Sequence, residues 1–350
     1  MSGGDLPSPT LGLQRVGRFT LESGETLTNV EQGWALLGTL SPRRDNVVLV
    51  LHSLTGAPGD LAGWYPEVIG PGKAIDTDRF AVLSPNLLGS CYGTRFVAKG
   101  AASITTRDQA RLVALLLDDL GVSRVALATG GSLGGMVALE WAASFPERSE
   151  TVAVFAAPAA HTAWGIGWNH VMRRAVAALG VDGLALARMA GMLVYRTPGE
   201  FETRFGRGEV EGGELAVRSY LDHHGEKLVG RFDAASYVAL LDAMDAHDVG
   251  RGRGSVAEAL SAYSGRLVGI GIPGDVLYPP EDVRRWTEAA GAELRFLRST
   301  HGHDGFLLEV EDVSRLFRDL LPEPDSSASR GLARAPRAAE KEVFANIPLG

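Results

Sequence analysis

Three side-chain types in this sequence could together carry out nucleophilic catalysis: a serine, a histidine and an aspartate. Ser132 stands in the turn Gly-Gly-Ser-Leu-Gly at 130–134, between an apolar run at 125–128 and a helix-like stretch at 136–143. Small residues on both sides of a serine allow a sharp turn that lifts its hydroxyl out at the carboxyl edge of a sheet. The alternatives are an incidental serine in a Gly-rich turn and a phosphate-binding loop, but no Lys-Ser/Thr pair follows the glycines. We therefore predict that Ser132 is a nucleophile.

A nucleophilic serine needs a base to accept its proton, and the base needs a carboxylate to orient it. After a nucleophile turn of this kind, the chain order is serine, acid, histidine. Asp275 follows the apolar run at 267–270, and His303 lies farther along in a loop that also contains His301. We predict Asp275 as the acid and His303 as the base, with the reversed roles of the two histidines as the alternative.

The charge that develops on the substrate oxygen needs two backbone N–H groups directed at it. One should come from Leu133, directly after the nucleophile, and the other from Leu54, in the loop after the apolar run at 47–51. The backbone of His52 should help to shape that loop. The remaining histidines have no metal-ligand spacing, so we expect no metal site.

The elements that would position these residues are short buried strands separated by helices. Apolar runs that predict strands lie at 47–51, 80–83, 125–128, 152–155 and 267–270, with a weaker one at 294–297. Runs that are apolar throughout, rather than alternating, are typical of parallel strands covered on both faces. Helical patterns at 107–120 and 136–143 separate them. The sequence therefore predicts an α/β protein with the α/β-hydrolase fold, a mostly parallel doubly wound sheet.

Between about 160 and 265 the strand signals disappear. Helix-forming stretches take their place at 171–179, 183–193, 198–205 and 236–245. We predict a core formed by residues 12–160 and 265–321, an inserted helical cap (lid) at 161–264, and flexible termini at 1–11 and 322–350.

Composition limits the class of protein. The chain has 350 residues, 45% of them apolar, and a net charge of −8, which argues against a nucleic-acid or anionic-membrane partner. Its one cysteine, Cys91, excludes an intramolecular disulfide. The first 13 residues lack the apolar core of a signal peptide, and no apolar run approaches the length of a membrane span, so we expect a cytoplasmic protein.

Several segments resemble one family, the homoserine O-acetyltransferases, whose α/β-hydrolase members acylate homoserine or serine from acetyl-CoA or succinyl-CoA. The matching stretches are 52–56, 69–80, 86–94, the nucleophile turn through 141, 219–222 with Lys227, 231–233 and 303–309. Their order and number, over about residues 12–320, make the resemblance specific.

The resemblance implies roles for particular residues. It supports Ser132, Asp275 and His303 as a catalytic triad. Stretches 183–188 and 194–196 are similar to the family's segment for the substrate carboxylate. Arg188 and Tyr195, seven residues apart, would share a helix face, where Arg188 could bind a carboxylate through two hydrogen bonds.

Asp304, next to the base, is similar to the family's contact with the substrate ammonium. Without the family, Arg188 would be interpreted as a surface arginine and Asp304 as a loop-capping carboxylate. The resemblance also implies a homodimer, no permanently bound cofactor, and acetyl-CoA or succinyl-CoA as a co-substrate beside a small amino-acid acceptor.

The chain departs from the family pattern near the expected substrate entrance. Family members often continue with Thr-Gly-Pro where this chain has Arg95, and the loop that follows is shorter. His170, Met172 and Arg174 stand where Glu, Gln and Gln are common, and Gly305 replaces a frequent Ala. These changes leave the acyl donor and the acceptor open. Arg95 is a candidate contact for a CoA phosphate or a succinyl carboxylate, and a solvent-facing role is the alternative.

The sequence as a whole therefore predicts a two-step acyl transfer through an acyl-serine, with a helical cap that holds the acceptor and limits water. Acetyl transfer to homoserine or a similar amino acid is the favoured reaction. The alternatives are succinyl transfer, a serine esterase or thioesterase with the same three residues, and a non-catalytic binding protein of the same fold.

Overall fold

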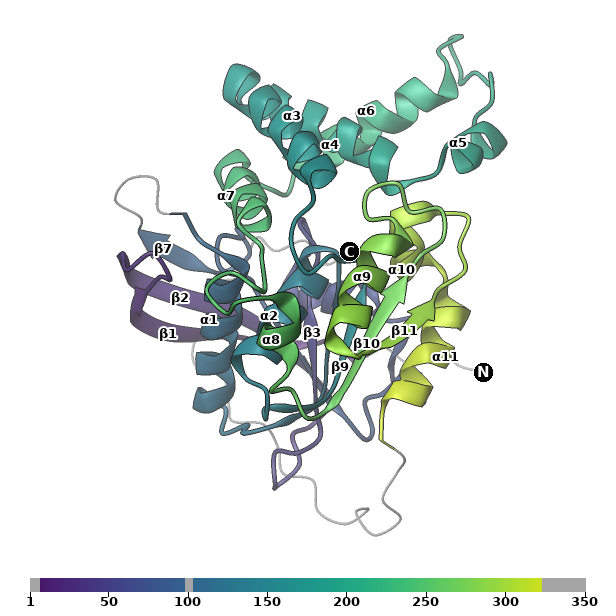
Figure 1. Cartoon of the computed structure of the whole chain (residues 1–350). Helices are drawn as coiled ribbons and strands as arrows, with labels where there is room; N and C mark the ends of the chain where they lie inside the picture. The colour runs from purple at the N-terminus through teal and green to yellow at the C-terminus, as the bar shows by residue number, and fades with distance from the viewer. Residues whose placement is uncertain (1–6, 98–102, 323–350) are drawn as a thin grey trace.

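The computed structural model describes residues 7–97 and 103–322. Within this part, nine strands form one sheet, in the order β1-β2-β6-β3-β8-β9-β10-β11, with β7 paired to β2 (Figure 1). The strands are β1 (Thr10–Thr20), β2 (Thr26–Leu37), β3 (Val47–Leu51), β6 (Ala81–Pro85), β7 (Arg95–Val97), β8 (Val125–Gly131), β9 (Ser149–Phe155), β10 (Arg266–Gly271) and β11 (Glu293–Phe296). Strands β4 (Ile69–Gly70) and β5 (Ile75–Asp76) form a separate parallel pair.

The sheet is parallel from β6 to β11, and β1, β2 and β7 pair antiparallel. Side chains of β3 show why its apolar run is continuous. Leu49 and Leu51 face one buried core, whereas Val48 and Val50 face the other. Since successive side chains of a strand point to opposite faces, a strand covered on both faces needs apolar residues at every position. The predicted α/β class and α/β-hydrolase architecture are confirmed.

Helices cover both faces of the sheet. Those of the core are α1 (Thr106–Asp119), α2 (Leu133–Ser144), α8 (Val256–Leu260), α9 (Pro280–Ala290), α10 (Gly305–Leu308) and α11 (Val310–Leu320), with the 3-10 turns η1 (Pro58–Gly63) and η2 (Gly302–Asp304). Apolar side chains of α1, α2, α8 and α9 belong to one core, and those of α11 and η1 to the other. The parallel strands are therefore packed against apolar side chains on both faces of the sheet.

After β9 the chain leaves the sheet and forms helices above the carboxyl ends of the parallel strands (Figure 1). These are α3 (Ala163–Leu179), α4 (Val181–Tyr195), α5 (Pro198–Arg204), α6 (Ala216–Val229) and α7 (Ala234–Asp245). We call this group the cap helices. Helix α8 lies in the range predicted for the cap but contacts α2 and α9 of the core. None of the described helices combines the length and apolar character needed to cross a bilayer.

The amino-terminal segment differs from expectation. The sequence predicts flexible residues at 1–11, but β1 begins at Thr10, and the hydroxyl of Tyr65 donates a 2.6 Å hydrogen bond to the Pro7 carbonyl. The pairing of β1 with β2 gives the backbone at Thr10 a fixed partner, which the polar composition of this segment does not indicate. Residues 1–6 and 323–350 lie outside the described part of the chain.

Candidate active site

Ser132 lies at the junction between β8 and α2. Its backbone has φ 57° and ψ −124°, a conformation in which a side chain other than glycine is strained. Neighbouring glycines make the turn possible: a Cβ on Gly134 would overlap the carbonyl oxygen of Leu51, and one on Gly130 would lie 2.6 Å from the Gly134 carbonyl carbon. The Gly-x-Ser-x-Gly pattern is therefore a requirement of close packing between this turn and β3.

His303 and Asp275 are hydrogen-bonded beside Ser132. Nδ1 of His303 lies 2.7 Å from Oδ2 of Asp275, and both side chains are buried. The other carboxylate oxygen, Oδ1, accepts hydrogen bonds from the backbone N–H groups of Leu277 (2.8 Å) and Tyr278 (2.9 Å). The carboxylate thus places a proton on Nδ1 and leaves the lone pair of Nε2 available. Such a histidine can accept a proton from a hydroxyl.

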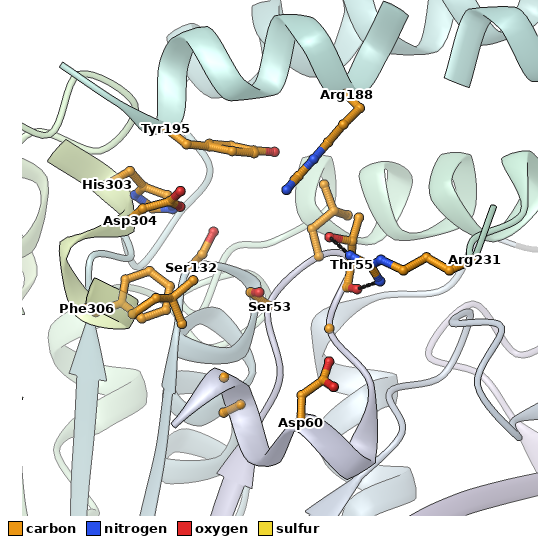
Figure 2. Close-up of a pocket in the computed structure, with 15 residues that line it drawn as sticks. Ser53, Thr55, Asp60, Ser132, Arg188, Tyr195, Arg231, His303, Asp304 and Phe306 are labelled. Atoms are coloured by element: carbon orange, nitrogen blue, oxygen red, sulfur yellow. Dashed lines mark hydrogen bonds between the residues drawn. The ribbon is translucent and has the colours of Figure 1, made fainter. Parts of the chain in front are cut away.

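The available nitrogen of His303 and the hydroxyl of Ser132 line one pocket. Nε2 is buried and has no hydrogen-bond partner among the described residues. In Figure 2 the Ser132 hydroxyl rises from the floor of the pocket toward the side where His303 and Tyr195 lie. A serine and the free nitrogen of an oriented histidine in one pocket is the arrangement needed for nucleophilic attack.

Aromatic rings surround the His303 imidazole. The ring centroids of Tyr195, Tyr278 and Phe306 lie 5.8, 5.4 and 5.7 Å from its own. Burial lowers the pKa of His303, but the charge and hydrogen bond of Asp275 oppose burial and leave the pKa above its usual value. The protonated form that would arise during proton transfer is therefore stabilised.

His301, the alternative base, has a different partner. Its Nδ1 lies 3.1 Å from Oε1 of Glu200, at the start of α5. Because Asp275 bonds to His303 instead, the geometry favours His303 over His301 as the base.

The loop that follows β3 carries the predicted donor Leu54, and the His52 side chain holds it. The backbone N–H of Leu87 donates to Nε2 of His52 (3.0 Å), so the proton of the neutral ring is on Nδ1, which donates to the Ser53 carbonyl (2.8 Å). Burial lowers the pKa of His52, in keeping with a neutral ring. The sequence predicts only that the backbone of His52 helps to shape this loop. The structure adds that the His52 side chain holds the loop through two hydrogen bonds.

The two predicted oxyanion donors lie at the pocket or beside it. Leu54 lines the pocket, and the N–H of Leu133 is the first of helix α2, where no intrahelical acceptor exists. The N–H of Ser132 itself is bound to the Phe155 carbonyl (3.1 Å). The N-terminus of α2 therefore directs the Leu133 N–H and a partial positive charge toward the serine.

Arg188 reaches into the pocket from the cap (Figure 2). Its guanidinium carbon lies 5.8 Å from the ring centroid of Tyr195, so these two residues share one face of α4. No carboxylate of the described residues forms a salt bridge with Arg188. An arginine in a pocket without an anionic partner can bind a carboxylate ligand.

Asp304 lines the pocket but already has a partner. Its Oδ2 accepts a 3.0 Å hydrogen bond from Nε of Arg196, whose NH1 lies 2.8 Å from Glu200. Burial raises the pKa of Asp304, and the positive charges of Arg196 and His303 oppose that rise. A carboxylate that shares its charge with an arginine attracts an ammonium group less strongly than a free one.

Sequence reasoning gave no role to two charged residues of the pocket, Arg231 and Asp60. Arg231 follows α6 and donates hydrogen bonds to the loop after β3. Asp60 lies in η1 and accepts a 2.9 Å hydrogen bond from the N–H of Ala57. The resemblance of residues 231–233 to the family was the one feature of the sequence that pointed to Arg231, and it implied no role for this residue.

The remaining predicted features are Arg95, His170, Arg174 and Gly305. Arg95 lies in β7, but its side chain is not among the described ones. His170 and Arg174 are exposed and do not line the pocket. A Cβ on Gly305 would lie 2.6 Å from that of Ser299, which accounts for glycine in place of alanine. The described side chains contain no cluster suited to a metal ion.

Comparison with known proteins places these features in a family. The α/β hydrolase fold family matches residues 46–180. Homoserine O-acetyltransferases from Thermobifida fusca and Thermus thermophilus are 41% and 42% identical, over 91% and 88% of this chain and 95% and 90% of their own lengths. The chain belongs to the homoserine O-acetyltransferase family. The crystal structure of the Staphylococcus aureus homoserine O-acetyltransferase covers 92% of this chain and 98% of its own, with a TM-score of 0.79 and 28% identity.

The fold of the homoserine O-acetyltransferase family is shared more widely. Esterase E22, at 22% identity, superposes with a TM-score of 0.79 over 90% of this chain and 100% of its own. At that identity the likeness shows the fold alone. The fold by itself therefore does not distinguish a transferase from an esterase.

Proposed function

We propose that this protein transfers an acetyl group from acetyl-CoA to the side-chain hydroxyl of homoserine, through an acetyl ester of Ser132. Arg188 supports this proposal most directly: an arginine without a carboxylate partner among the described residues projects into the pocket that also contains Ser132 and His303. An enzyme that only hydrolyses esters has no need of a cation there, whereas an amino-acid acceptor brings a carboxylate.

In the first half-reaction His303 takes the proton of the Ser132 hydroxyl on Nε2, and Oγ attacks the thioester carbon. The backbone N–H groups of Leu54 and Leu133 stabilise the resulting oxyanion. When the carbon–sulfur bond breaks, the proton on His303 passes to the sulfur, and CoA leaves as a thiol. Asp275 holds the imidazole in the required tautomer, since it binds Nδ1 at 2.7 Å.

In the second half-reaction homoserine occupies the space that CoA has left. Arg188 binds its carboxylate, and the Asp304 carboxylate contacts its ammonium group. His303 takes the proton of the homoserine hydroxyl, which attacks the acetyl carbon, and then returns that proton to Oγ of Ser132. The new ester is O-acetylhomoserine, and the serine is regenerated.

Transfer exceeds hydrolysis when the acceptor hydroxyl is held at the ester more often than water. The helices above the carboxyl ends of the strands supply Arg188 and Tyr195 for that purpose. Tyr195 also contributes its ring to the wall beside His303, which limits the access of water.

A matrix of two donors and two acceptors tests this assignment. We expect acetyl-CoA with homoserine to give the fastest product, identified by its mass, and serine to react more slowly. A faster reaction with succinyl-CoA than with acetyl-CoA would reassign the donor without changing the mechanism. Free acetate as the only product, with homoserine present at high concentration, would identify a hydrolase and overturn the proposal.

The acetyl-serine intermediate has its own test. Incubation with acetyl-CoA alone should add one acetyl group to the intact protein, located on the peptide that contains Ser132, and the Ser132→Ala variant should not be labelled. Initial rates at varied concentrations of both substrates should give the parallel double-reciprocal lines of a ping-pong reaction. Intersecting lines without a labelled serine would contradict the intermediate.

A homodimer, which the family resemblance implied, remains a proposal. Large apolar side chains are exposed on α3 and α4: Trp164, Ile166, Val171, Leu179, Val181, Leu186 and Leu193. A second copy of the chain would cover them. Sedimentation equilibrium should give twice the chain mass for the wild type, and Val171→Glu should weaken the association.

A further inference from the structure

Arg231 joins the cap to the loop that carries the oxyanion donor. It stands between α6 and α7, and its NH1 group donates 2.7 Å hydrogen bonds to the Thr55 carbonyl and to the Tyr92 hydroxyl. A longer contact of 3.5 Å joins NH2 to the Thr55 hydroxyl. Figure 2 shows the guanidinium beside Thr55 at the edge of the pocket. A cap residue thus holds the peptide group between Thr55 and Gly56.

The partners of Arg231 are neutral. No carboxylate of the described residues forms a salt bridge with it, so the strong donors of the guanidinium are used on a backbone carbonyl and a phenol. A hydrogen bond from a charged donor is roughly twice as strong as a neutral one. An arginine committed to one loop in this way restricts the orientation of that loop.

The same loop is held from the opposite side by the core. His52 donates to the Ser53 carbonyl (2.8 Å), and the Gly56 N–H donates to it as well (3.0 Å). The Ser53 carbonyl and the Leu54 N–H belong to one planar peptide group, so the two hydrogen bonds to this carbonyl set the direction of the Leu54 N–H. One of these bonds comes from the Gly56 N–H, and Arg231 holds the peptide group of that N–H through the Thr55 carbonyl.

We infer that Arg231 is a positioning residue for catalysis: it fixes the Leu54 N–H toward the oxyanion and makes the oxyanion hole depend on the cap. The inference rests on the proposed role of Leu54 in acyl transfer. It assigns no substrate contact to Arg231. Loss of the arginine should therefore slow formation of the acyl-serine from any acyl donor by the same factor, whatever the leaving group.

The test compares two donors that share the acetyl group and little else. p-Nitrophenyl acetate acylates serine nucleophiles without a CoA moiety, and acetyl-CoA carries one. Removing an oxyanion donor costs about 10²–10³ in kcat, so misdirecting one by Arg231→Met should slow acylation about 10- to 100-fold with both donors. The KM for homoserine should stay within about twofold. An unchanged rate with p-nitrophenyl acetate, together with a large loss with acetyl-CoA, would make Arg231 a CoA contact and overturn the inference.

Tyr92 provides a second variant. Tyr92→Phe removes one acceptor of Arg231 and should slow acylation less than Arg231→Met does. In the double variant the effect of Tyr92→Phe should disappear, because it acts through the arginine. Independent, multiplying effects of the two substitutions would contradict the inference. If Arg231→Met does not fold, Arg231→Lys and Tyr92→Phe supply the same comparison.

Arg204→Met is the matched control. That arginine is an exposed cap residue that stacks on Phe205 and Tyr220 and does not line the pocket, so acylation should be unchanged. Wild-type protein that is acylated by p-nitrophenyl acetate but forms no O-acetylhomoserine would refute the proposed function and leave the role of Arg231 intact. Equal acylation by wild type and Arg231→Met would refute only the role of Arg231.

Discussion

Both oxygens of the Asp275 carboxylate are occupied, and one of them binds Nδ1 of His303 at 2.7 Å. The backbone N–H groups on Oδ1 leave the aspartate no freedom to rotate away from the imidazole. The pair therefore acts as one unit, with a fixed tautomer and a fixed ring orientation.

Asp275→Asn should reduce kcat about 10⁴-fold. The amide would donate to Nδ1, place the imidazole proton on Nε2 and remove the lone pair that must accept the serine proton. Steady-state acetyl transfer measures the loss, and an unchanged circular dichroism spectrum shows that the fold persists. A loss of less than about tenfold would mean that His303 does not depend on Asp275 for its tautomer.

Activity should fall in acid with an apparent pKa above 6.5. The attack requires neutral His303, and the pKa of this histidine is raised above that value because Asp275 stabilises its protonated form. A raised pKa keeps the imidazolium populated to higher pH, so kcat/KM should rise with pH through a midpoint above that of an ordinary histidine. A pH profile of kcat/KM for acetyl-CoA measures this apparent pKa, and a midpoint below 6.5 would contradict the assignment of His303 as the base.

Arg188→Met should weaken the binding of the acceptor, homoserine, and leave the reaction with the donor, acetyl-CoA, almost unchanged. Loss of charged hydrogen bonds to a carboxylate costs about 1.5–3 kcal/mol, which corresponds to about 10- to 150-fold in the apparent KM for homoserine. The rate of Ser132 acetylation by acetyl-CoA alone should stay within about threefold. If acetylation slowed as much as transfer, Arg188 would be assigned to the donor instead.

Gly134→Ala and Gly167→Ala should have opposite effects on stability. A methyl at 134 meets the Leu51 carbonyl oxygen, so the turn must open and activity should be lost. Gly167 is exposed in the second turn of α3 with nothing within 4 Å of the added carbon, and alanine there should stabilise the protein by about 0.5–1 kcal/mol. Thermal melting measures both. A stable, active Gly134→Ala would show that the close packing is not required.

His303 had to be found from the chain order, because the strand before it, β11, is only partly buried. Ser132 and Asp275 could be predicted from the sequence because both follow buried parallel strands. Such strands are continuous apolar runs, and their carboxyl ends meet at one edge of the sheet. β1 and β2 escaped prediction because their side chains are partly exposed and polar, and the register shifts near Gly17 interrupt the pattern.

The parts of the site that the sequence did not indicate come from long-range contacts. Arg231 binds Thr55 across 176 residues, and Arg196 reaches Asp304 across 108. The spacing of residues along the sequence does not indicate such pairs, because they depend on how the cap packs against the core. The hydrogen bond from Leu87 to His52 is hidden for the same reason.

Helix α4 is attached to the catalytic loop at its carboxyl end. Just beyond Tyr195, Arg196 binds Asp304, and the Thr197 hydroxyl donates to the Thr300 carbonyl (2.7 Å). Arg188 lies two turns back, about 10 Å along the axis at about 1.5 Å per residue. The position of Arg188 along α4 therefore sets its distance from the catalytic loop. On the proposed role of Arg188 in acceptor binding, moving the arginine by one turn toward the start of α4 would lengthen the accepted substrate by about 5 Å. The length of the acceptor would then be set by the position of one arginine along a helix, and not by the catalytic residues.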